Sequence, residues 1–248
     1  NLQTGRTVGT EAIGTTFFPN MALPLQTSGA STTLANTNAI VFDESVQLRD
    51  EAQVWGTEIS FLTDPHVPGE GFKWQWLGGF RYLNLDERFG LTGVFNNGST
   101  VADRITTITS DTINNVYGPE VGGRASIVHR WFSFGVTPRV MFGLNDRTAE
   151  VASDALGTGV VTRFRDRHVD FTPITQLSFT GEINLSQRFS VFGGYDFLWI
   201  PLITRAHENI AANSTPALGG GFDPDIRLAN RREAFAAQGF SFGAVFRY

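Results

Sequence analysis

Apolar and polar residues alternate strictly over long stretches of this chain. The stretch Gly239–Tyr248, GFSFGAVFRY, places aromatic residues and one alanine on one parity, and glycine, serine, valine and arginine on the other. Successive side chains of a β-strand point to opposite faces, so this period predicts strands and not helices. Seven segments follow the pattern: residues 45–62, 72–89, 117–127, 132–142, 169–183, 189–199 and 239–248.

The residues on the two parities indicate what surrounds these strands. One parity carries Phe, Trp and Tyr, whereas the other carries small or charged residues. Both parities are explained if the aromatic one faces lipid and the small or charged one faces a polar or tightly filled barrel interior. The longest apolar run, Phe197–Ile203, is too short for a membrane helix and contains Pro201. Only helices and closed barrels satisfy their backbone groups in lipid. The sequence therefore predicts an all-β fold, an antiparallel transmembrane β-barrel of the outer-membrane type.

The connections between the strands alternate in length. We expect short reversals near residues 64–71, 129–131 and 184–187, and long polar loops near residues 96–107, 145–161 and 206–231. Outer-membrane barrels have short periplasmic turns and long external loops, which would put the C-terminus on the periplasmic side.

Strand number follows from this order. An even number requires one more upward strand before the seven segments, and Thr4–Phe18 is the candidate. We therefore expect about eight strands, or about ten to twelve if further sequence precedes this chain. Residues 1–248 are expected to form a single barrel domain, with 1–44 as an N-terminal strand and loop and 45–248 as the main barrel strands.

Composition supports a membrane barrel and excludes some chemistry. Charged residues are only 17% and aromatic residues 12%, with 22 Phe and 27 Gly, a mix that is unusual for a soluble domain. The absence of cysteine excludes disulfides and thiolate metal sites. The net charge of −5 argues against a nucleic-acid partner. A soluble β-sandwich remains the alternative, in which the aromatic rows would form a core between two sheets.

Several ordered motifs carry a family resemblance. WGTEISFL, WLGGFRYLNLDERF, VYGPEVGGRA, FTPITQLSFTGEINLSQRFSVFGGYDFLW and AAQGFSFGAVFRY occur in this order between about Val54 and Tyr248. Together they resemble the putative beta-barrel porin family of planctomycete-type bacteria. The resemblance implies a bacterial outer-membrane location and a barrel architecture, and it names no solute. The aromatic C-terminal strand is also similar to the signal that the barrel-assembly machinery recognises.

The parity predicts which side chains face the lumen and which face lipid. The predicted lumen-lining residues are Glu58, Lys73, Arg81, Glu87, Glu120, Arg124, Arg139, Asp170, Glu182, Asp196 and Arg247. The predicted membrane-facing aromatic residues are Trp55, Phe61, Trp74, Trp76, Phe80, Tyr82, Phe132, Phe134, Phe179, Phe197, Trp199, Phe240, Phe242, Phe246 and Tyr248. Opposite charges in similar numbers could pair and fill a narrow barrel, or they could line a water channel.

Three functions stay open on this evidence. A passive pore would let small solutes or ions diffuse, whereas a closed structural barrel would use its loops for surface contacts. An outer-membrane hydrolase could use His168 and Asp170 as base and orienter, although no serine motif accompanies them. The four histidines lack metal-ligand spacing, so we expect no catalytic residue, no cofactor and no metal site.

The expected partners follow from the same features. They are outer-membrane lipid and, through the C-terminal strand, the barrel-assembly machinery, while a homo-oligomer stays open. The basic run Arg163–His168 near the outer rim could contact lipopolysaccharide phosphates or an acidic neighbour, although a solvated loop is the simpler interpretation.

Overall fold

The fold is known from a computed structural model. It describes residues 7–12, 16–17, 21–27, 38–42, 45–69, 71–95, 104–154, 161–186, 188–216 and 222–246. The elements are β1 (Thr7–Ala12), β2 (Thr16–Phe17), β3 (Met21–Thr27), β4 (Asn38–Phe42), β5 (Ser45–Leu62), β6 (His66–Gly69), β7 (Phe72–Phe95), β8 (Arg104–Val128), β9 (Phe132–Ser153), β10 (Thr162–Asn184), β11 (Phe189–Ile203), the 3-10 helix η2 (His207–Asn209), β12 (Ile210–Pro216), β13 (Phe222–Leu228) and β14 (Glu233–Phe246). The described chain is therefore all-β apart from one short turn of helix.

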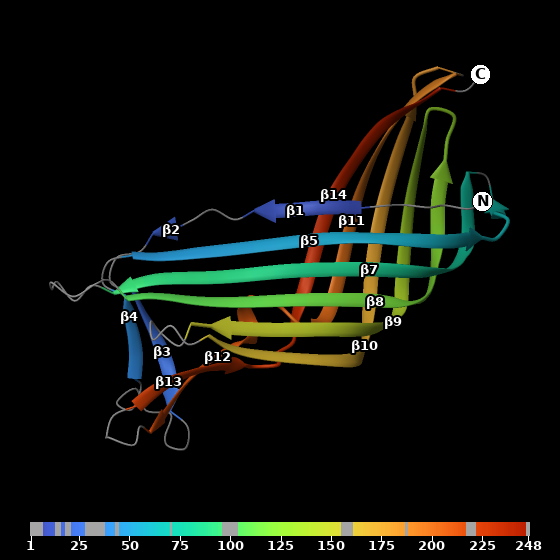
Figure 1. Ribbon diagram of the computed structural model, residues 1–248. Coiled ribbons are helices and arrows are strands. Elements are labelled where there is room, and N and C mark those ends of the chain that lie inside the picture. The colour runs from blue at the N-terminus through green and yellow to red at the C-terminus, as the bar shows by residue number, and fades with distance from the viewer. Residues whose placement is uncertain are drawn as a thin grey trace.

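Two sheets organise these strands. The large, 10-stranded sheet runs β1-β5-β7-β8-β9-β10-β11-β14, and β2 and β6 pair with β5 and β7 off this path. Its neighbouring strands are antiparallel throughout. A 4-stranded sheet, β13-β12-β3-β4, lies beside one end of the large sheet (Figure 1). Outside β1, the strands along the path are the seven that alternation predicts.

The large sheet curls strongly into half of a barrel. β5, β7 and β8 run side by side, while β11 and β14 run steeply across their direction (Figure 1). The curl is deep enough for Arg205, just beyond β11, to contact Glu87 on β7 across the concave side. No sheet pairing joins β1 to β14 among the described residues. The barrel class expected from the sequence is confirmed, with an antiparallel, curled sheet as its wall.

The N-terminal candidate strand lies partly within the described residues. Thr4–Phe18 includes β1 and β2, and both pair antiparallel with β5, which gives β1 the upward direction that an even strand number requires. Residues 4–6, 13–15 and 18 lie outside the described part of the chain.

The expected loops are shorter than the sequence suggests. Residues 145–153 belong to β9 and residues 104–107 to β8, so these strands continue into regions that were expected to be loops. The expected loop 206–231 contains η2, β12 and β13. In contrast, the reversal at 129–131 is confirmed, where the His129 amide donates to the Phe132 carbonyl at 2.8 Å. We call this end of the sheet the turn end and the opposite end the loop end.

Outward side chains form an apolar belt over the turn-end half. The belt comprises the outward parity of β7 from Phe72 to Tyr82, of β8 from Tyr117 to Ile127, of β9 from Phe132 to Leu144 and of β10 from Val169 to Ile183. Along β9 it covers about 40 Å at about 3.3 Å per residue, which at a tilt of about 45° matches a hydrocarbon core of about 30 Å.

The outward face becomes polar immediately beyond the belt. Toward the loop end, the same parity continues with Asn84, Asn115, Asp146 and Arg167. The Asn115 side-chain oxygen accepts from Tyr82 Oη at 2.6 Å and from Asn84 Nδ2 at 3.0 Å. The strands therefore extend well past the apolar belt, with amide and charged groups facing outward.

The concave face at the loop end has an apolar core of its own. Phe42 from β4 and Ile226 from β13 pack with Val46, Ile108 and Val151 of the large sheet, and all five are buried. A Cβ at Gly93 would collide with the Phe42 ring, so this glycine makes room for the ring against the sheet. The small sheet thereby covers the loop-end part of the concave face.

Candidate functional site: the concave wall of the sheet

Four charged residues meet on the concave wall at the depth of the apolar belt. We call Glu58, Arg81, Glu120 and Arg139, on β5, β7, β8 and β9, the central ion-pair cluster. Glu58 accepts from Arg81 Nη2 at 2.9 Å and from Arg139 Nη1 at 2.7 Å. Glu120 lies 3.8 Å from Arg81 Nη1 and 3.7 Å from Arg139 Nη1. Two carboxylates thus balance two guanidinium groups.

This cluster is largely withdrawn from solvent. The Glu120 side chain is 0% exposed and the others are 7–14% exposed, so each charge depends on its partners for stabilisation. Ser60 Oγ donates to Glu120 Oε1 at 3.1 Å and supplies a further polar contact. Strand alternation explains the arrangement, because the outward neighbours of Arg81, Glu120 and Arg139 belong to the apolar belt.

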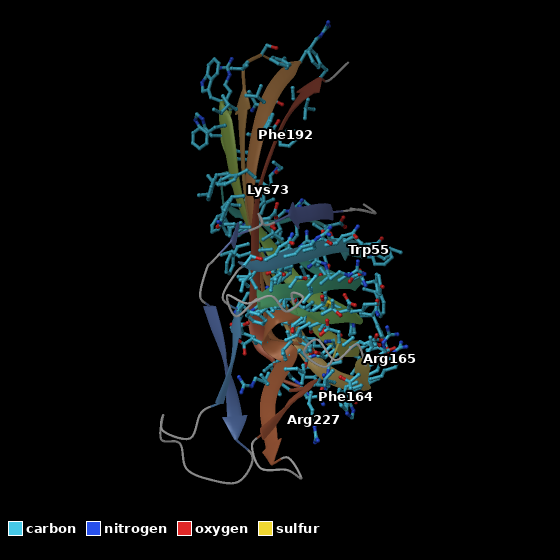
Figure 2. The ribbon with its side chains drawn as sticks, turned by 60° about the vertical axis from the view of Figure 1, so that its left-hand side comes forward. Trp55, Lys73, Phe164, Arg165, Phe192 and Arg227 are labelled. Atoms are coloured by element: carbon cyan, nitrogen blue, oxygen red, sulfur yellow. The ribbon has the colours of Figure 1, made fainter. Side chains whose placement is uncertain are left out.

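Further polar groups line the wall toward the turn end. Asp196 accepts from Ser178 Oγ at 2.5 Å and from Gln176 Nε2 at 3.4 Å, and Glu182 accepts from Ser190 Oγ at 2.5 Å. Lys73 and Arg124 lie half-buried on the same face. Figure 2 labels Lys73 in this part of the sheet. The concave wall is therefore polar along the turn-end half of the sheet.

A row of apolar side chains separates this region from the loop end. Leu83, Leu85, Val116, Met141, Ile174, Ile200 and Ile203 form one buried cluster across β7 to β11. The row is continuous from strand to strand. Buried apolar side chains are not expected in the wall of a water-filled channel, so this row favours a closed lumen.

The chain after β11 crosses the concave face. We call Ile203–Asn209 the crossing segment. Arg205 Nε donates to both oxygens of Glu87, at 2.6 and 2.9 Å, and the Ala206 amide adds a contact of 3.2 Å. Asn114 Nδ2 donates to the Thr204 carbonyl at 2.9 Å, and Thr204 N donates to Asn114 Oδ1 at 3.3 Å. These contacts fix the segment against β7 and β8.

Glu87 lies beyond the apolar belt, where its ionisation depends on two opposing effects. Burial raises the pKa of its carboxyl above the ordinary value, while the Arg205 charge and the Ala206 amide oppose that shift. Burial is the larger effect on the pKa of Glu87, and the Arg205 guanidinium is the main group that favours the ionised form against it.

Apart from Glu87, which is in the predicted lumen-lining set, the crossing segment and its partners were not predicted from the sequence. Asn114 lies outside every alternating segment in the prediction. Arg147, whose Nη1 donates to Thr204 Oγ1 at 3.2 Å, lies in an expected loop. Arg205 comes just after β11, and none of these residues stands in a recognisable motif. The curl of the sheet brings them together, and alternation along one strand carries no information about it.

The structure does not bring His168 and Asp170 together as a pair. Asp170 accepts from Arg147 Nε at 2.8 Å and from Arg232 Nη2 at 2.6 Å. The His168 imidazole lies 3.4 Å from Asp166 instead. The hypothesis of a base and its orienter at these two positions therefore has no support in the geometry.

The two residue lists from the sequence fall on opposite faces of the sheet. The described members of the expected lumen-lining set lie on the parity of the central ion-pair cluster, and the described aromatic residues lie on the opposite parity. Arg247 and Tyr248 lie outside the described residues. Phe192, which interrupts the alternation, lies on the concave face over Gly243. Phe240, Phe242 and Phe246 are 81%, 89% and 74% exposed.

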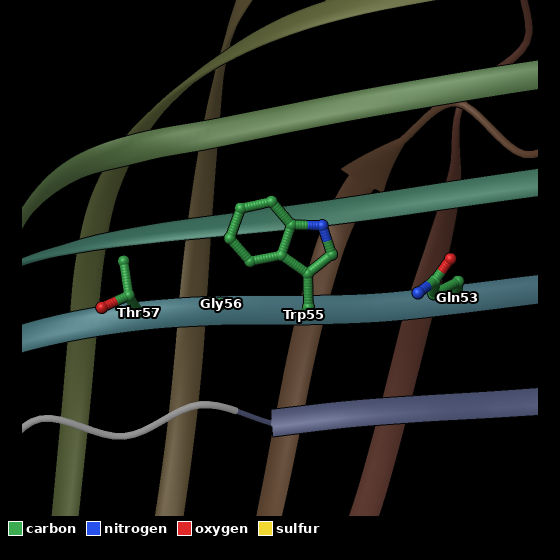
Figure 3. Close-up of a pocket in the computed structure, with 4 residues that line it drawn as sticks. All are labelled: Gln53, Trp55, Gly56 and Thr57. Carbon is green, nitrogen blue, oxygen red and sulfur yellow. The ribbon is translucent and has the colours of Figure 1, made fainter.

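A shallow pocket on β5 is separate from the concave wall. Gln53, Trp55, Gly56 and Thr57 line it (Figure 3), and three of them belong to the outward parity. The Trp55 ring lies 5.1 Å from the Tyr82 ring at the boundary of the apolar belt. This position suits an interfacial aromatic pair, and none of the four lining residues belongs to the central ion-pair cluster.

The fold and the wall define a class of protein. A curled antiparallel sheet with an apolar outer belt and a charged concave wall is a β-barrel membrane protein of the porin type. The chain belongs to the family described as Putative beta barrel porin-7, whose sequence model matches residues 25–248. Membership implies an outer-membrane β-barrel. No curated protein and no solved structure matches the chain. In its described part, no helix is long and apolar enough to cross a bilayer.

Proposed function

We propose that this protein is a barrel of the bacterial outer membrane through which small ions and solutes diffuse passively. The observation that carries the proposal is the central ion-pair cluster, which lies on the concave wall directly behind the apolar belt. A polar wall at membrane depth requires either paired charges or water, and a diffusion pore uses both. Family membership supports the same assignment.

The charge balance of the wall bears on selectivity. Two acidic and two basic groups neutralise each other in the central ion-pair cluster, so we expect weak preference between small anions and cations. The crossing segment narrows the space above the loop-end half of the wall. Removing a basic member of the cluster would leave a carboxylate in excess and favour cations.

The experiment is conductance in planar bilayers. We expect stepwise currents from the purified, folded protein, with a reversal potential near zero in a salt gradient. Arg81→Gln should shift the reversal potential toward cation selectivity, because the cluster then has a net negative charge: two carboxylates, Glu58 and Glu120, against the one guanidinium of Arg139. Arg88→Gln, on the outward face of the same strand, is the matched control and should leave it unchanged. A folded protein that inserts and never conducts would rule the pore out.

A closed structural barrel is the second candidate. The buried apolar row across β7 to β11 favours it, and so does the crossing segment fixed by the Arg205–Glu87 ion pair. In that case Arg205→Ala, which frees the segment, should still produce no current steps. If the variant conducts and the unmodified protein does not, the crossing segment acts as a plug, and the protein is a pore that this segment holds closed.

We also infer that the barrel has no catalytic role. The separate partners of His168 and Asp170 support this inference, since His168 lies 3.4 Å from Asp166 and Asp170 is paired with Arg147. Incubation of the folded protein with lipid esters and peptides tests it, and hydrolysis that His168→Ala abolishes would contradict it.

A further inference from the structure

Three arginines stand in a row on the outward face of β10. Arg163, Arg165 and Arg167 share the parity of Val169 and Phe171, the last belt residues toward the loop end. We call these three the arginine row. Figure 2 shows Arg165 on the same side of the molecule as Trp55, which also stands beside the belt. The row therefore begins where the apolar surface ends.

The arginine row carries more positive charge than its neighbours neutralise. Arg167 pairs with Asp146, at 2.9 and 2.5 Å, and Arg163 pairs with Glu150 at 3.0 Å. The outward positions of β9 opposite the row offer only these two carboxylates. Arg165 has no ion pair among the described residues, although it lies directly across from Glu150. One guanidinium thus remains available for an external anion.

The arginine row is also open on its other side. β11 pairs with β10 only from Thr175 to Asn184, so the loop-end part of β10 has β9 as its sheet neighbour along the described chain. The Arg163 and Arg167 side chains are 67% and 69% exposed. A ligand can therefore approach the row from the outward face and from the side away from β9.

We propose that the arginine row binds the phosphate groups of anionic lipid headgroups. Its depth favours this ligand, because the headgroup region adds roughly 5–7 Å on each side of the hydrocarbon core. Arg167 stands two residues and Arg165 four residues beyond Val169, about 7 and 13 Å along a strand and less in height once the strand is tilted. The long side chain of Arg165 can reach back toward the headgroups. Guanidinium groups bind phosphate oxygens bidentately, and the phosphate would join Arg165 to its paired neighbours. The inference rests on the proposed membrane location and not on conductance.

The experiment measures lipid retention by native mass spectrometry. Purified protein is reconstituted with equal amounts of phosphatidylglycerol and phosphatidylcholine and then released from detergent. We expect the unmodified protein to retain phosphatidylglycerol at least about fivefold over phosphatidylcholine. Arg165→Gln should reduce that ratio about threefold, and the triple change of Arg163, Arg165 and Arg167 to Gln should bring it close to one.

The control is Arg49→Gln. Arg49 is an equally exposed outward arginine at the loop end of β5, paired with Glu51. It should keep the unmodified ratio, and unchanged phosphatidylcholine retention together with heat-modifiable migration would show that each variant is folded. A triple variant that retains the preference, or a control that loses it equally, would overturn the proposal.

A further arm separates lipid from soluble anion. Inorganic phosphate at millimolar concentration should not displace the retained phosphatidylglycerol, because the acyl chains also contact the belt. Displacement would show a site for soluble anions and contradict a lipid ligand. A barrel that conducts but shows no lipid preference would contradict this inference alone. A barrel that retains the lipid but never conducts would contradict the pore alone.

Discussion

The two halves of β9 differ in which face meets apolar surroundings. In the turn-end half it is the outward face, and in the loop-end half it is the concave face. From Phe132 to Leu144 the outward side chains are apolar, and the concave side carries Thr137 and Arg139. From Asn145 to Ser153 the outward side chains include Asp146 and Glu150, while Ala149 and Val151 are buried on the concave side. The outward face of one continuous strand therefore changes from apolar to polar directly after Leu144, and buried apolar residues lie on the concave side of the loop-end half.

This change along the strand indicates that the outer surface of one sheet faces hydrocarbon in its turn-end half and water in its loop-end half. In the turn-end half, the outer surface requires hydrocarbon and the wall satisfies its own charges. In the loop-end half, the outer surface requires water, and the apolar concave face is covered by β4, β12 and β13 as in a water-soluble sandwich. The barrel thus continues beyond the membrane as a packed, hydrated extension.

The largest expected effect comes from breaking the central ion-pair cluster. Glu58→Ala leaves Arg81 and Arg139 in a buried site with Glu120 alone, at 3.8 and 3.7 Å, which should cost about 3–5 kcal/mol of stability. Urea unfolding in vesicles, followed by tryptophan fluorescence, measures it. Glu51→Ala, an outward position in the loop-end half of the same strand, is the control and should change little. Equal losses at the two positions would show that the halves do not differ in solvent access.

The next effect tests the outward face directly. Val140→Arg puts a charge inside the apolar belt and should cost about 2–4 kcal/mol, as charged residues do near the bilayer midplane. Thr148→Arg has the same parity on the same strand but lies beyond the belt, so it should be close to neutral. Folding yield into vesicles and the urea midpoint report both changes. A similar penalty at Thr148 would place hydrocarbon around the loop-end half as well.

A smaller effect should come from the covered concave face of the extension. Gly93→Leu drives a side chain into the Phe42 ring and should cost about 1–3 kcal/mol through overpacking. The small sheet should loosen, so limited proteolysis should cut within residues 206–231 while the belt half stays intact. Gly90→Leu, on the outward parity, is the matched control. Cleavage that spreads into β7 to β10 would argue against two separable halves.

The smallest effect is expected for ion pairs on the hydrated outer surface. Arg88 Nε lies 2.8 Å from Asp111, and these side chains are 65% and 41% exposed. Arg88→Gln should cost less than about 1 kcal/mol, and the difference should vanish in high salt. Thermal melts at two salt concentrations measure it. A large, salt-independent loss would mean that this surface is not in water.

The sequence predicts the turn-end half well because its two faces differ strongly. Residues 45–62 match β5 at both ends. Along the belt segments of β7 and β9, aromatic and aliphatic residues alternate mainly with small, polar or charged ones. Past Leu144 and before Tyr117, small polar residues stand on both faces, so alternation loses its contrast. That is why residues 145–153 of β9 and residues 104–107 of β8 were expected to be loops.

The ion pairs were only partly accessible from the sequence. Parity places Glu58 and Arg81 on one face, and their direct pairing follows from the register of neighbouring strands. Arg139 lies on β9, with β7 and β8 between it and Glu58, and reaches it only because the sheet curls. The same curl unites Arg205 with Glu87. Curvature arises from the whole sheet, so no local pattern encodes these contacts.

The change of solvent along β9 is the central claim, and spin labels test it most directly. The chain has no cysteine, so a single cysteine can be placed at Phe134, Val140, Thr148 or Ala152 and labelled. Collision with oxygen, which concentrates in lipid, and with an aqueous nickel chelate then reports the surroundings of each label. We predict oxygen access at the first two positions and nickel access at the last two. Nickel access at all four, or no change past Leu144, would contradict the account.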